Sequence, residues 1–443
     1  MKISLSEHFT YKKLLRFVLP SVSMMIVTSL YTIVDGFFVS NFVGKNPFAA
    51  LNLIWPFLTL IGMAGFMIGS GGSALVAFTL GEKKDKKANE IFTMLIIILS
   101  IFGVIISAAG FIFMRPISYL LGANEALIDY CVLYGRILIS ANTFFMLQNA
   151  FQSFLITAEK PKLGLAISIA AGFTNVILDF VLVYIFRLGI WGAASATALS
   201  QFIGGMIPLI YFLRKNSSRL RLVKCRLEFK MILKACTNGS SEMMTNLSSS
   251  IIGLMYNYQL LKIAGENGVA AYGAIMYVSF IFMSLFFGYS MGVTPIVGYH
   301  YGAENCDELK NLLKKSLILT AVTGTAMTLL GYFTAWPLAK IYVGYDDVLY
   351  NMTAYGMKIF TFSFILSGFN IFASAFFTGL NNGKVSAAIS FLRTLVIQVI
   401  SILALPILFG LNGIWAATIA AEGITIIVTT ILFIANRKKY KYF

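Results

Sequence analysis

The chain has 443 residues, of which 58% are hydrophobic and 12% charged, with a mean hydropathy of +0.82 and a net charge of +16. A soluble domain carries about 25% charged residues, so this composition excludes an ordinary globular domain and indicates a polytopic membrane protein. The positive charge does not indicate a nucleic-acid partner, because the basic residues lie in short loops between apolar runs. The four cysteines lack metal-ligand spacing, and with only two histidines no metal cluster is expected.

Apolar runs long enough to span a membrane, about 20 residues each, follow one another along the whole chain. They lie near residues 14–40, 50–80, 91–114, 127–157, 163–186, 190–213, 233–262, 268–299, 315–337, 351–379, 385–409 and 412–435. The sequence therefore predicts an all-α integral membrane protein with twelve transmembrane helices. The first run is too long for a cleavable signal peptide, contains Pro20 and Asp35, and has no small-residue cleavage site, so it is expected to remain as helix 1.

Lysine and arginine are concentrated in alternate loops. One set of loops includes residues 83–87, 214–234 and 437–441, which are strongly basic, whereas the opposite loops hold only scattered lysines and arginines. The positive-inside rule then predicts that both termini are cytoplasmic in a multi-pass protein of the cell membrane. An even number of helices agrees with that orientation.

The second half of the chain is a diverged copy of the first. The matching positions are Gly71 and Gly292, Gly81 and Gly302, Tyr134-Gly135 and Tyr355-Gly356, and, after a small insertion, Gly189-Ile190-Trp191 and Gly413-Ile414-Trp415. Six runs in each half give both copies the same orientation, an architecture found among secondary transporters. We expect a six-helix lobe at 1–215, a cytoplasmic basic linker at 216–234 and a second six-helix lobe at 235–443, related by a pseudo-two-fold axis along the membrane normal. A duplicated channel or membrane enzyme remains an alternative.

Two carboxylates lie inside apolar runs at matching depth. Asp35 lies about two turns from the outer end of the first run, and Asp179 lies at a similar depth in the fifth. Asn175 is on the same helical face as Asp179, and Thr197 of the sixth run reaches the same level. Because a charge in hydrocarbon costs at least a few kcal/mol, these four residues predict a site for a proton or for a small hard cation.

The second half does not copy this acidic set. Asp35 aligns with Tyr256, and the acid nearest the inner end of the seventh run is Glu242, with Asn246 one turn further. Glu242 and Asn246 could contact a cationic substrate or assist gating. The alternative is an acid favoured by the dipole at a helix N-terminus.

The remaining polar or helix-breaking residues in the runs have simpler interpretations. Glu422 is expected to pair with Arg393 as a structural ion pair, and Arg136 and Lys358 are expected to extend their side chains to the outer interface. Pro20 removes a helical hydrogen bond and permits a kink in helix 1, which could couple protonation to bending.

The chain resembles the multidrug and toxic compound extrusion (MATE) family over essentially its whole length. The resemblance is carried by Pro20 followed by Asp35, by Gly71-Gly72-Ser73-Ala74 through Gly81, by Gly292-Val293-Thr294-Pro295 through Tyr301-Gly302-Ala303, and by Asn175, Asp179 and Thr197. It implies twelve helices in two lobes and, as in the DinF-like members, a first-lobe cation site at Asp35, Asn175, Asp179 and Thr197. The NorM-like branch places acids in helices 7 and 10, but no acid lies between Tyr355 and Leu380 here. The polar start of helix 7, residues 238–242, looks more like the MepA-like branch.

The resemblance also implies a function. The expected activity is export of lipophilic, cationic drugs or toxic metabolites in exchange for H⁺ or Na⁺ by alternating access. The protein is expected to be a monomer in contact with membrane lipids, without a cofactor and without a nucleic-acid partner. The alternative is a lipid-linked precursor flippase, which should have a cationic central cavity, for which this chain offers mainly Arg393. HExxH and paired-aspartate motifs are absent from the sequence, so an enzyme is not expected.

Overall fold

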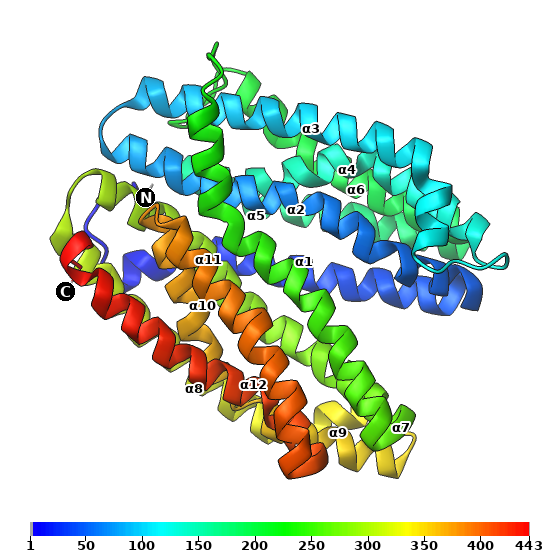
Figure 1. Cartoon of the computed structure of the whole chain (residues 1–443). Coiled ribbons are helices and arrows are strands. Elements are labelled where there is room, and N and C mark those ends of the chain that lie inside the picture. Colours follow the sequence, from blue (N-terminus) through cyan, green and yellow to red (C-terminus); the bar gives the residue numbers. More distant parts are fainter. Residues whose placement is uncertain (1–2, 443) are drawn as a thin grey trace.

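The computed structural model describes residues 3–442, and the secondary-structure elements of this part of the chain are all helices (Figure 1). Residues 1–2 and 443, the outermost residues of the predicted lobes 1–215 and 235–443, lie outside the described part. The first half holds α1 (Tyr11–Phe42), α2 (Lys45–Gly81), α3 (Asp85–Leu120), α4 (Ile128–Thr157), α5 (Pro161–Leu178), the π-helical η1 (Asp179–Ile185) and α6 (Gly189–Leu213). The second half holds α7 (Phe229–Gly302), α8 (Cys306–Val343), α9 (Asp347–Phe360), α10 (Ser363–Gly379), α11 (Gly383–Phe391), the π-helical η2 (Leu392–Val396) and α12 (Ile397–Tyr440).

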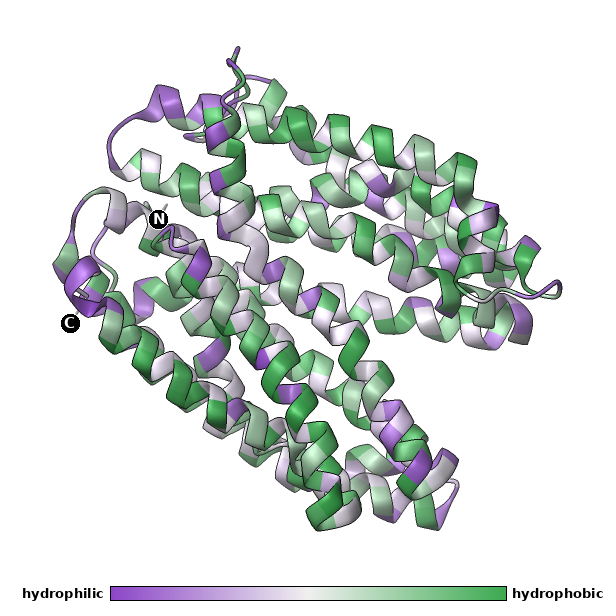
Figure 2. Ribbon diagram, viewed as in Figure 1, coloured by the Kyte–Doolittle hydropathy of each residue, from purple (hydrophilic) through white to green (hydrophobic). Residues whose placement is uncertain are grey.

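The helices have the length and composition of membrane spans. Within residues 3–442, nine helices are long and apolar enough to cross a membrane, and ten are if α9 and α10, which meet at 47°, form one broken span. Figure 2 shows apolar residues along the helices, whereas hydrophilic residues gather mainly at their ends. Helices satisfy their backbone hydrogen bonds internally and can therefore expose such apolar surfaces to lipid. The chain is a multi-pass membrane protein.

Two of the long helices reverse direction at a glycine. A straight helix with the 74 residues of α7 would be about 110 Å long, far more than the ~30 Å of hydrocarbon in a bilayer. Gly265 in α7 and Gly410 in α12 have φ values of 64° and 56°, which side-chain-bearing residues rarely adopt. Gly268 packs against Leu260 and Gly413 against Leu405, contacts that a continuous helix cannot make between residues eight positions apart. Both breaks fall in the gaps between predicted runs.

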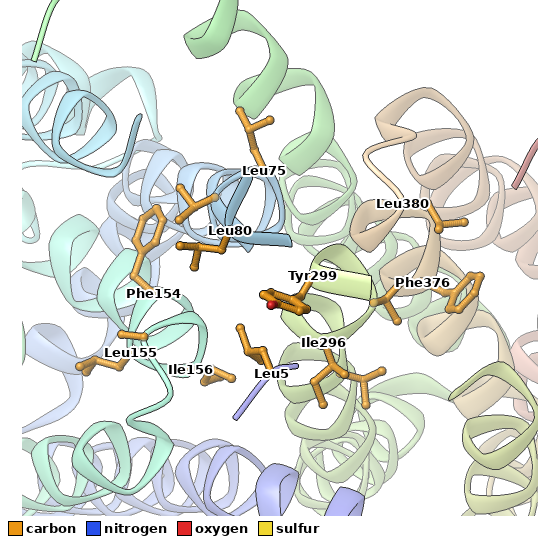
Figure 3. Packing of buried hydrophobic residues seen from close by; sticks show 14 of the residues in the cluster. Leu5, Leu75, Leu80, Phe154, Leu155, Ile156, Ile296, Tyr299, Phe376 and Leu380 are labelled. Atoms are coloured by element: carbon orange, nitrogen blue, oxygen red, sulfur yellow. The ribbon is translucent and has the colours of Figure 1, made fainter. Parts of the chain in front are cut away.

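The two halves meet closely at one end of the molecule. A Cβ atom added to Gly71 of α2 would overlap Gly239 of α7, and one added to Gly239 would overlap the Met67 carbonyl oxygen. The largest buried apolar cluster lies at the same end and includes residues of both halves. Figure 3 shows Leu75 and Phe154 from the first half and Tyr299 and Phe376 from the second within it. Small residues allow helix backbones to approach in this way, so this end is tightly closed.

The N-terminal segment 3–10 lies across this closed end and binds both halves. The Ser4 hydroxyl donates to Glu159 Oε1 at 2.7 Å, and the Leu5 N–H donates to the same oxygen at 3.1 Å. The Phe9 N–H donates to Glu308 Oε1 at 2.9 Å. Since Glu159 follows α4 and Glu308 begins α8, the segment links the first half to the second.

The contact between α2 and α7 predicts that Gly239→Val lowers the thermal unfolding midpoint of the detergent-solubilised protein. The added side chain forces the two helices apart, and overpacking of this kind costs about 1–3 kcal/mol or more. Gly253→Val is the matched control on the same helix, because a Cβ added to Gly253 meets no atom within 4 Å. Equal midpoints for the two variants would contradict the prediction.

Candidate functional site

A cavity of about 460 Å³ lies between the two halves, away from the N-terminal segment. The halves diverge toward this end, which is on the right of Figure 1. Both contribute to the cavity wall, and most of the large side chains there are aromatic. The wall includes Tyr31, Asp35, Phe48, Trp55, Asn175, Thr197, Tyr277 and Tyr342.

Four helical elements bring the predicted polar residues of the first half together. Asp35 comes from α1, Asn175 from α5, Asp179 from the first position of η1 and Thr197 from α6. Asn175 Nδ2 donates to Thr197 Oγ1 at 3.4 Å, and Thr197 Oγ1 donates to Asp35 Oδ1 at 3.4 Å. A hydroxyl group can accept one hydrogen bond and donate another, so the chain of contacts is chemically consistent. Both distances are long for hydrogen bonds, so these side chains are only weakly connected.

Asp179 has the least satisfied carboxylate of this set. Its side chain is fully buried, and neither of its oxygens has a hydrogen-bond donor or a cationic partner among residues 3–442. Its carboxyl group faces that of Asp35, but one carboxyl can donate to another only when it carries a proton. The Asn175 Oδ1 atom also lacks a donor. An uncompensated buried charge costs several kcal/mol, so this set of oxygens can hold a proton or an oxygen-liganded cation.

The backbone changes its winding where Asp179 lies. The helix of α5 continues as the π-helical segment η1 from Asp179 to Ile185, and the second half has a π-helical segment, η2, that carries Arg393. A π-helical turn adds a residue to the turn and therefore rotates the side chains that follow, and such turns are frequent at functional sites. Neither segment was expected from the periodicity of the sequence.

Pro20 is buried in α1 at the contact with α7. Gly288 packs against Ser21 and Val22, and Gly292 packs against Val18, so both sides of Pro20 along α1 touch glycines of α7. The helix runs without interruption from Tyr11 to Phe42. The kink that the sequence permits at Pro20 stays a prediction.

The second half has a neutral hydrogen-bonded triad at the position that matches Asp35. The displacement that takes Gly71 to Gly292 also takes Asp35 to Tyr256, whereas Thr197 lies beyond the small insertion and matches Ala421. The Tyr256 hydroxyl and Thr418 Oγ1 are 2.7 Å apart, and Gln398 Nε2 donates to each of them at 3.0 Å. These contacts are shorter than those of the first half and involve no charge. This triad therefore needs no ion to complete it.

Arg393 and Glu422 form the buried ion pair expected from the sequence. Arg393 Nε donates to the two Glu422 oxygens at 2.8 and 3.1 Å. Ser367 Oγ and Asn370 Nδ2 donate to the same carboxylate at 2.9 and 2.7 Å. Because Glu422 is paired and fully hydrogen-bonded, it is a structural group in this conformation.

Glu242 and Asn246 lie apart from the cavity. Both are half-buried on α7, and neither is among the residues that form the cavity wall. Asn246 Nδ2 donates to the Glu242 main-chain oxygen at 2.8 Å, so it leaves the Glu242 carboxylate free. The charged group facing that carboxylate is Arg393. The structure therefore does not bring these two residues to the site of Asp35.

The aromatic wall of the cavity is what the sequence did not identify. Tyr31, Trp55, Tyr277 and Tyr342 come from four different helices, and the rings of Tyr277 and Tyr342 stack with centroids 6.1 Å apart. Because phenylalanine, tyrosine and tryptophan make up 14% of the chain, no single one could be nominated without the fold. The only sequence signals for this wall are the internal repeat and the positive-inside rule, because together they indicate which helix ends lie on the same side of the membrane.

The fold and the site define an all-helical, multi-pass membrane protein with a buried acidic set beside a cavity between its halves. The family model MatE matches residues 20–181 and again residues 241–403. The chain therefore belongs to the MatE family, whose members are membrane transporters and not enzymes, and the resemblance stated from the sequence is confirmed. The starts of the two matches, at residues 20 and 241, show the same displacement as Gly71 and Gly292, as the internal repeat predicts.

Individual relatives are distant but extend over nearly the whole chain. The multidrug export protein MepA of Staphylococcus saprophyticus is 22% identical over 409 residues, 92% of this chain and 88% of that protein. MepA of Staphylococcus haemolyticus is 23% identical over 417 residues, 94% of this chain and 91% of that one. Among solved structures, a MATE protein in complex with MaL6 has a TM-score of 0.93 at 22% identity, with 98% of each chain covered. An outward-facing MATE multidrug resistance transporter of the MOP superfamily has a TM-score of 0.91 at 22% identity, also with 98% of each chain covered.

The unsatisfied carboxylate predicts that Asp179→Asn raises the thermal unfolding midpoint in sodium-free buffer at pH 8. The substitution removes a buried carboxylate without a donor and supplies an amide donor to the carboxyl group of Asp35, a gain of about 1–3 kcal/mol. The control is Asp129→Asn, which changes an exposed aspartate paired with Arg115. A fall in the midpoint of the Asp179 variant would show that the carboxylate has a partner.

Proposed function

We propose that the chain is a secondary antiporter that exports lipophilic, cationic compounds in exchange for H⁺ or Na⁺ by alternating access, and that it acts as a monomer. The observation that carries this proposal is the buried Asp179 carboxylate, without a donor among residues 3–442, beside Asp35 at the wall of an aromatic cavity. Such a group needs a proton or a cation, and the cavity gives it a route. Membership of the MatE family and the names of the MepA relatives, which are multidrug export proteins, support the export function.

The proposal includes twelve membrane-crossing segments in two six-helix lobes. Residues 1–215 form one lobe, residues 235–443 form the other, and the basic stretch 216–234 links them. Dividing α7 at Gly265 and α12 at Gly410, and treating α9 with α10 as one bent span, gives this number in the described part of the chain. The repeated MatE match supports a pseudo-two-fold relation between the lobes.

Both termini are cytoplasmic in this proposal, and the protein lies in the cell membrane. The N-terminal segment, the linker and the loops richest in lysine and arginine all lie at the closed end of the molecule (Figure 1). The cavity at the other end then opens to the outside. The proposed state of this structure is therefore outward-open.

The coupling cation would enter from the cavity and bind at Asp35, Asn175, Asp179 and Thr197. Binding neutralises the two carboxyl groups and draws the loosely connected oxygens together, which moves α1 toward α5 and α6. The contacts from Thr197 to its two neighbours, each 3.4 Å long, have room to shorten in this step. Pro20 gives α1 a position at which it can bend, because a proline weakens the helical hydrogen-bond ladder.

The cavity has the chemistry of a site for a lipophilic cation. Its volume of about 460 Å³ lies in the range of drug-sized ligand pockets, ~300–1,000 Å³. Aromatic faces attract cations, and Asp35 supplies the only acidic group of the described cavity wall. Asp35 also contacts Thr197 of the cation site, so a cationic substrate and the coupling ion would meet at one carboxylate.

The alternative, a lipid-linked precursor flippase, requires basic residues in the cavity to bind a diphosphate group. None of the described residues in the cavity wall is basic. Arg393, the main candidate from the sequence, is buried and paired with Glu422. The antiporter therefore agrees better with the observed charges.

Asp35→Asn and Asp179→Asn are each predicted to reduce ethidium efflux to the level of cells without the protein. Both variants keep the size of the side chain but lose the group that binds and releases the cation. The measurement is efflux from cells and from proteoliposomes with a pH gradient or a Na⁺ gradient imposed separately. Asp129→Asn should transport as the wild type does, and full efflux by both site variants would refute the assignment.

Tyr277→Ala is predicted to raise the KM for an aromatic cation about 2- to 30-fold, because a cation–π contact contributes about 0.5–2 kcal/mol. Tyr258→Ala is the matched control, since this exposed tyrosine of α7 does not belong to the cavity wall. An equal effect of the two substitutions would argue that the aromatic wall does not bind the substrate.

A further inference from the structure

Each half of the molecule carries one cation on its lipid-facing surface, over an aromatic ring. The Arg136 guanidinium of α4 lies over the ring of Phe111 of α3, 5.1 Å from its centroid. The Lys358 ammonium of α9 lies over Tyr332 and Trp336 of α8, 4.9 and 5.4 Å from the two centroids. Neither cation forms an ion pair with a described residue.

The two arrangements lie close together in the repeat, although the cations are not at matching positions. The displacement that takes Gly71 to Gly292 takes Phe111 to Tyr332, but it takes Arg136 to Met357, which is buried and one residue before Lys358. The aromatic ring is therefore at the matching position in both halves, and each ring has a cation over it. By contrast, the acidic set of the first half and the neutral triad of the second differ in their residues and in their charge.

The surroundings of both cations are apolar and exposed. Near Arg136, Ile112 and Phe113 are 66% and 57% exposed, and near Lys358, Phe333 is 73% exposed. In a multi-pass membrane protein, a surface of this kind faces lipid chains. A cation there without an acid partner has to reach the membrane interface, where lipid phosphate groups and water lie.

The direction of both side chains suits an anion at the membrane surface. Side chains of a helix tilt toward its N-terminus, and α4 and α9 both begin at the end where the cavity opens. Arg136 lies eight residues after the start of α4 and Lys358 eleven after the start of α9, about 12 and 16 Å along the axis. Long basic side chains extend from such depths toward the headgroup region.

The free donors match a phosphate group. Arg136 uses Nε to donate to the Phe111 main-chain oxygen at 3.2 Å, which leaves its two terminal nitrogens without a described acceptor. The Lys358 ammonium donates to no described residue. Tyrosine and tryptophan rings, as in Tyr332 and Trp336, are typical of the interface between headgroups and lipid chains.

We propose that Arg136 with Phe111 and Lys358 with Tyr332 and Trp336 form two similar binding sites for the phosphate group of a membrane phospholipid. Each site holds one lipid against the outer surface of a half, with the phosphate on the cation and the chains along the exposed apolar residues. The assignment to the outer leaflet rests on the proposed orientation. The sites themselves do not depend on the transport function.

Native mass spectrometry of the full-length protein, released from mixed micelles that contain palmitoyl-oleoyl phosphatidylglycerol, tests the proposal. The wild type should retain two lipids, Arg136→Gln and Lys358→Gln one each, and the double variant none. Arg115→Gln is the matched control, because Arg115 is one turn from Phe111 on α3 but is paired with Asp129. This control should retain two lipids.

Two further measurements test whether the phosphate group and the acyl chains are both needed for binding. Diacylglycerol with the same chains lacks the phosphate and should not be retained, and inorganic phosphate, which lacks the chains, should not displace the lipid. Arg136→Lys and Lys358→Arg should restore binding, which separates loss of the cation from a folding defect. Equal lipid numbers in the wild type and the double variant, or equal retention of diacylglycerol, would overturn the proposal.

Discussion

The buried carboxylate of Asp179 is the constraint on which the working part of this protein depends. A carboxylate without a donor or counter-charge is costly inside a membrane protein, and the proton or cation in our proposal removes that cost. Asp35 on α1, Asn175 on α5 and Thr197 on α6 supply further oxygens around it. A π-helical turn begins at Asp179, and the cavity lies beside Asp35.

The two halves of the internal repeat share their helices but differ in their buried charged residues. Apolar helices with similar packing can carry different polar residues, because lipid-facing and helix-facing surfaces require only apolar character and close fit. The second half therefore has a closed neutral triad around Tyr256 and a separate ion pair of Arg393 and Glu422. Among the described residues, the buried carboxylate without a hydrogen-bond partner lies in the first half, so the two similar halves are chemically unequal.

The two ends of the molecule differ in how closely the halves approach each other. At one end, glycines of α2 and α7 bring the halves into backbone contact, and the segment 3–10 adds hydrogen bonds to both. At the other end, aromatic residues of both halves line the cavity. In the alternating access that we propose, close glycine contacts at the first end are exchanged for contacts between aromatic residues at the second.

The sequence by itself determined the apolar runs, the internal repeat, the family, and the four residues of the acidic set. Lipid forces each span to satisfy its own backbone and to be apolar, so counting along the chain gave the positions of the runs and the depth of Asp35 and Asp179. Even the reversals at Gly265 and Gly410 fell between predicted runs. The tertiary structure alone decided which aromatic residues form the cavity, how Gln398 closes the Tyr256 triad, and how the N-terminal segment joins the halves. Those features depend on contacts between residues far apart in the chain, and periodicity along one helix carries no information about them.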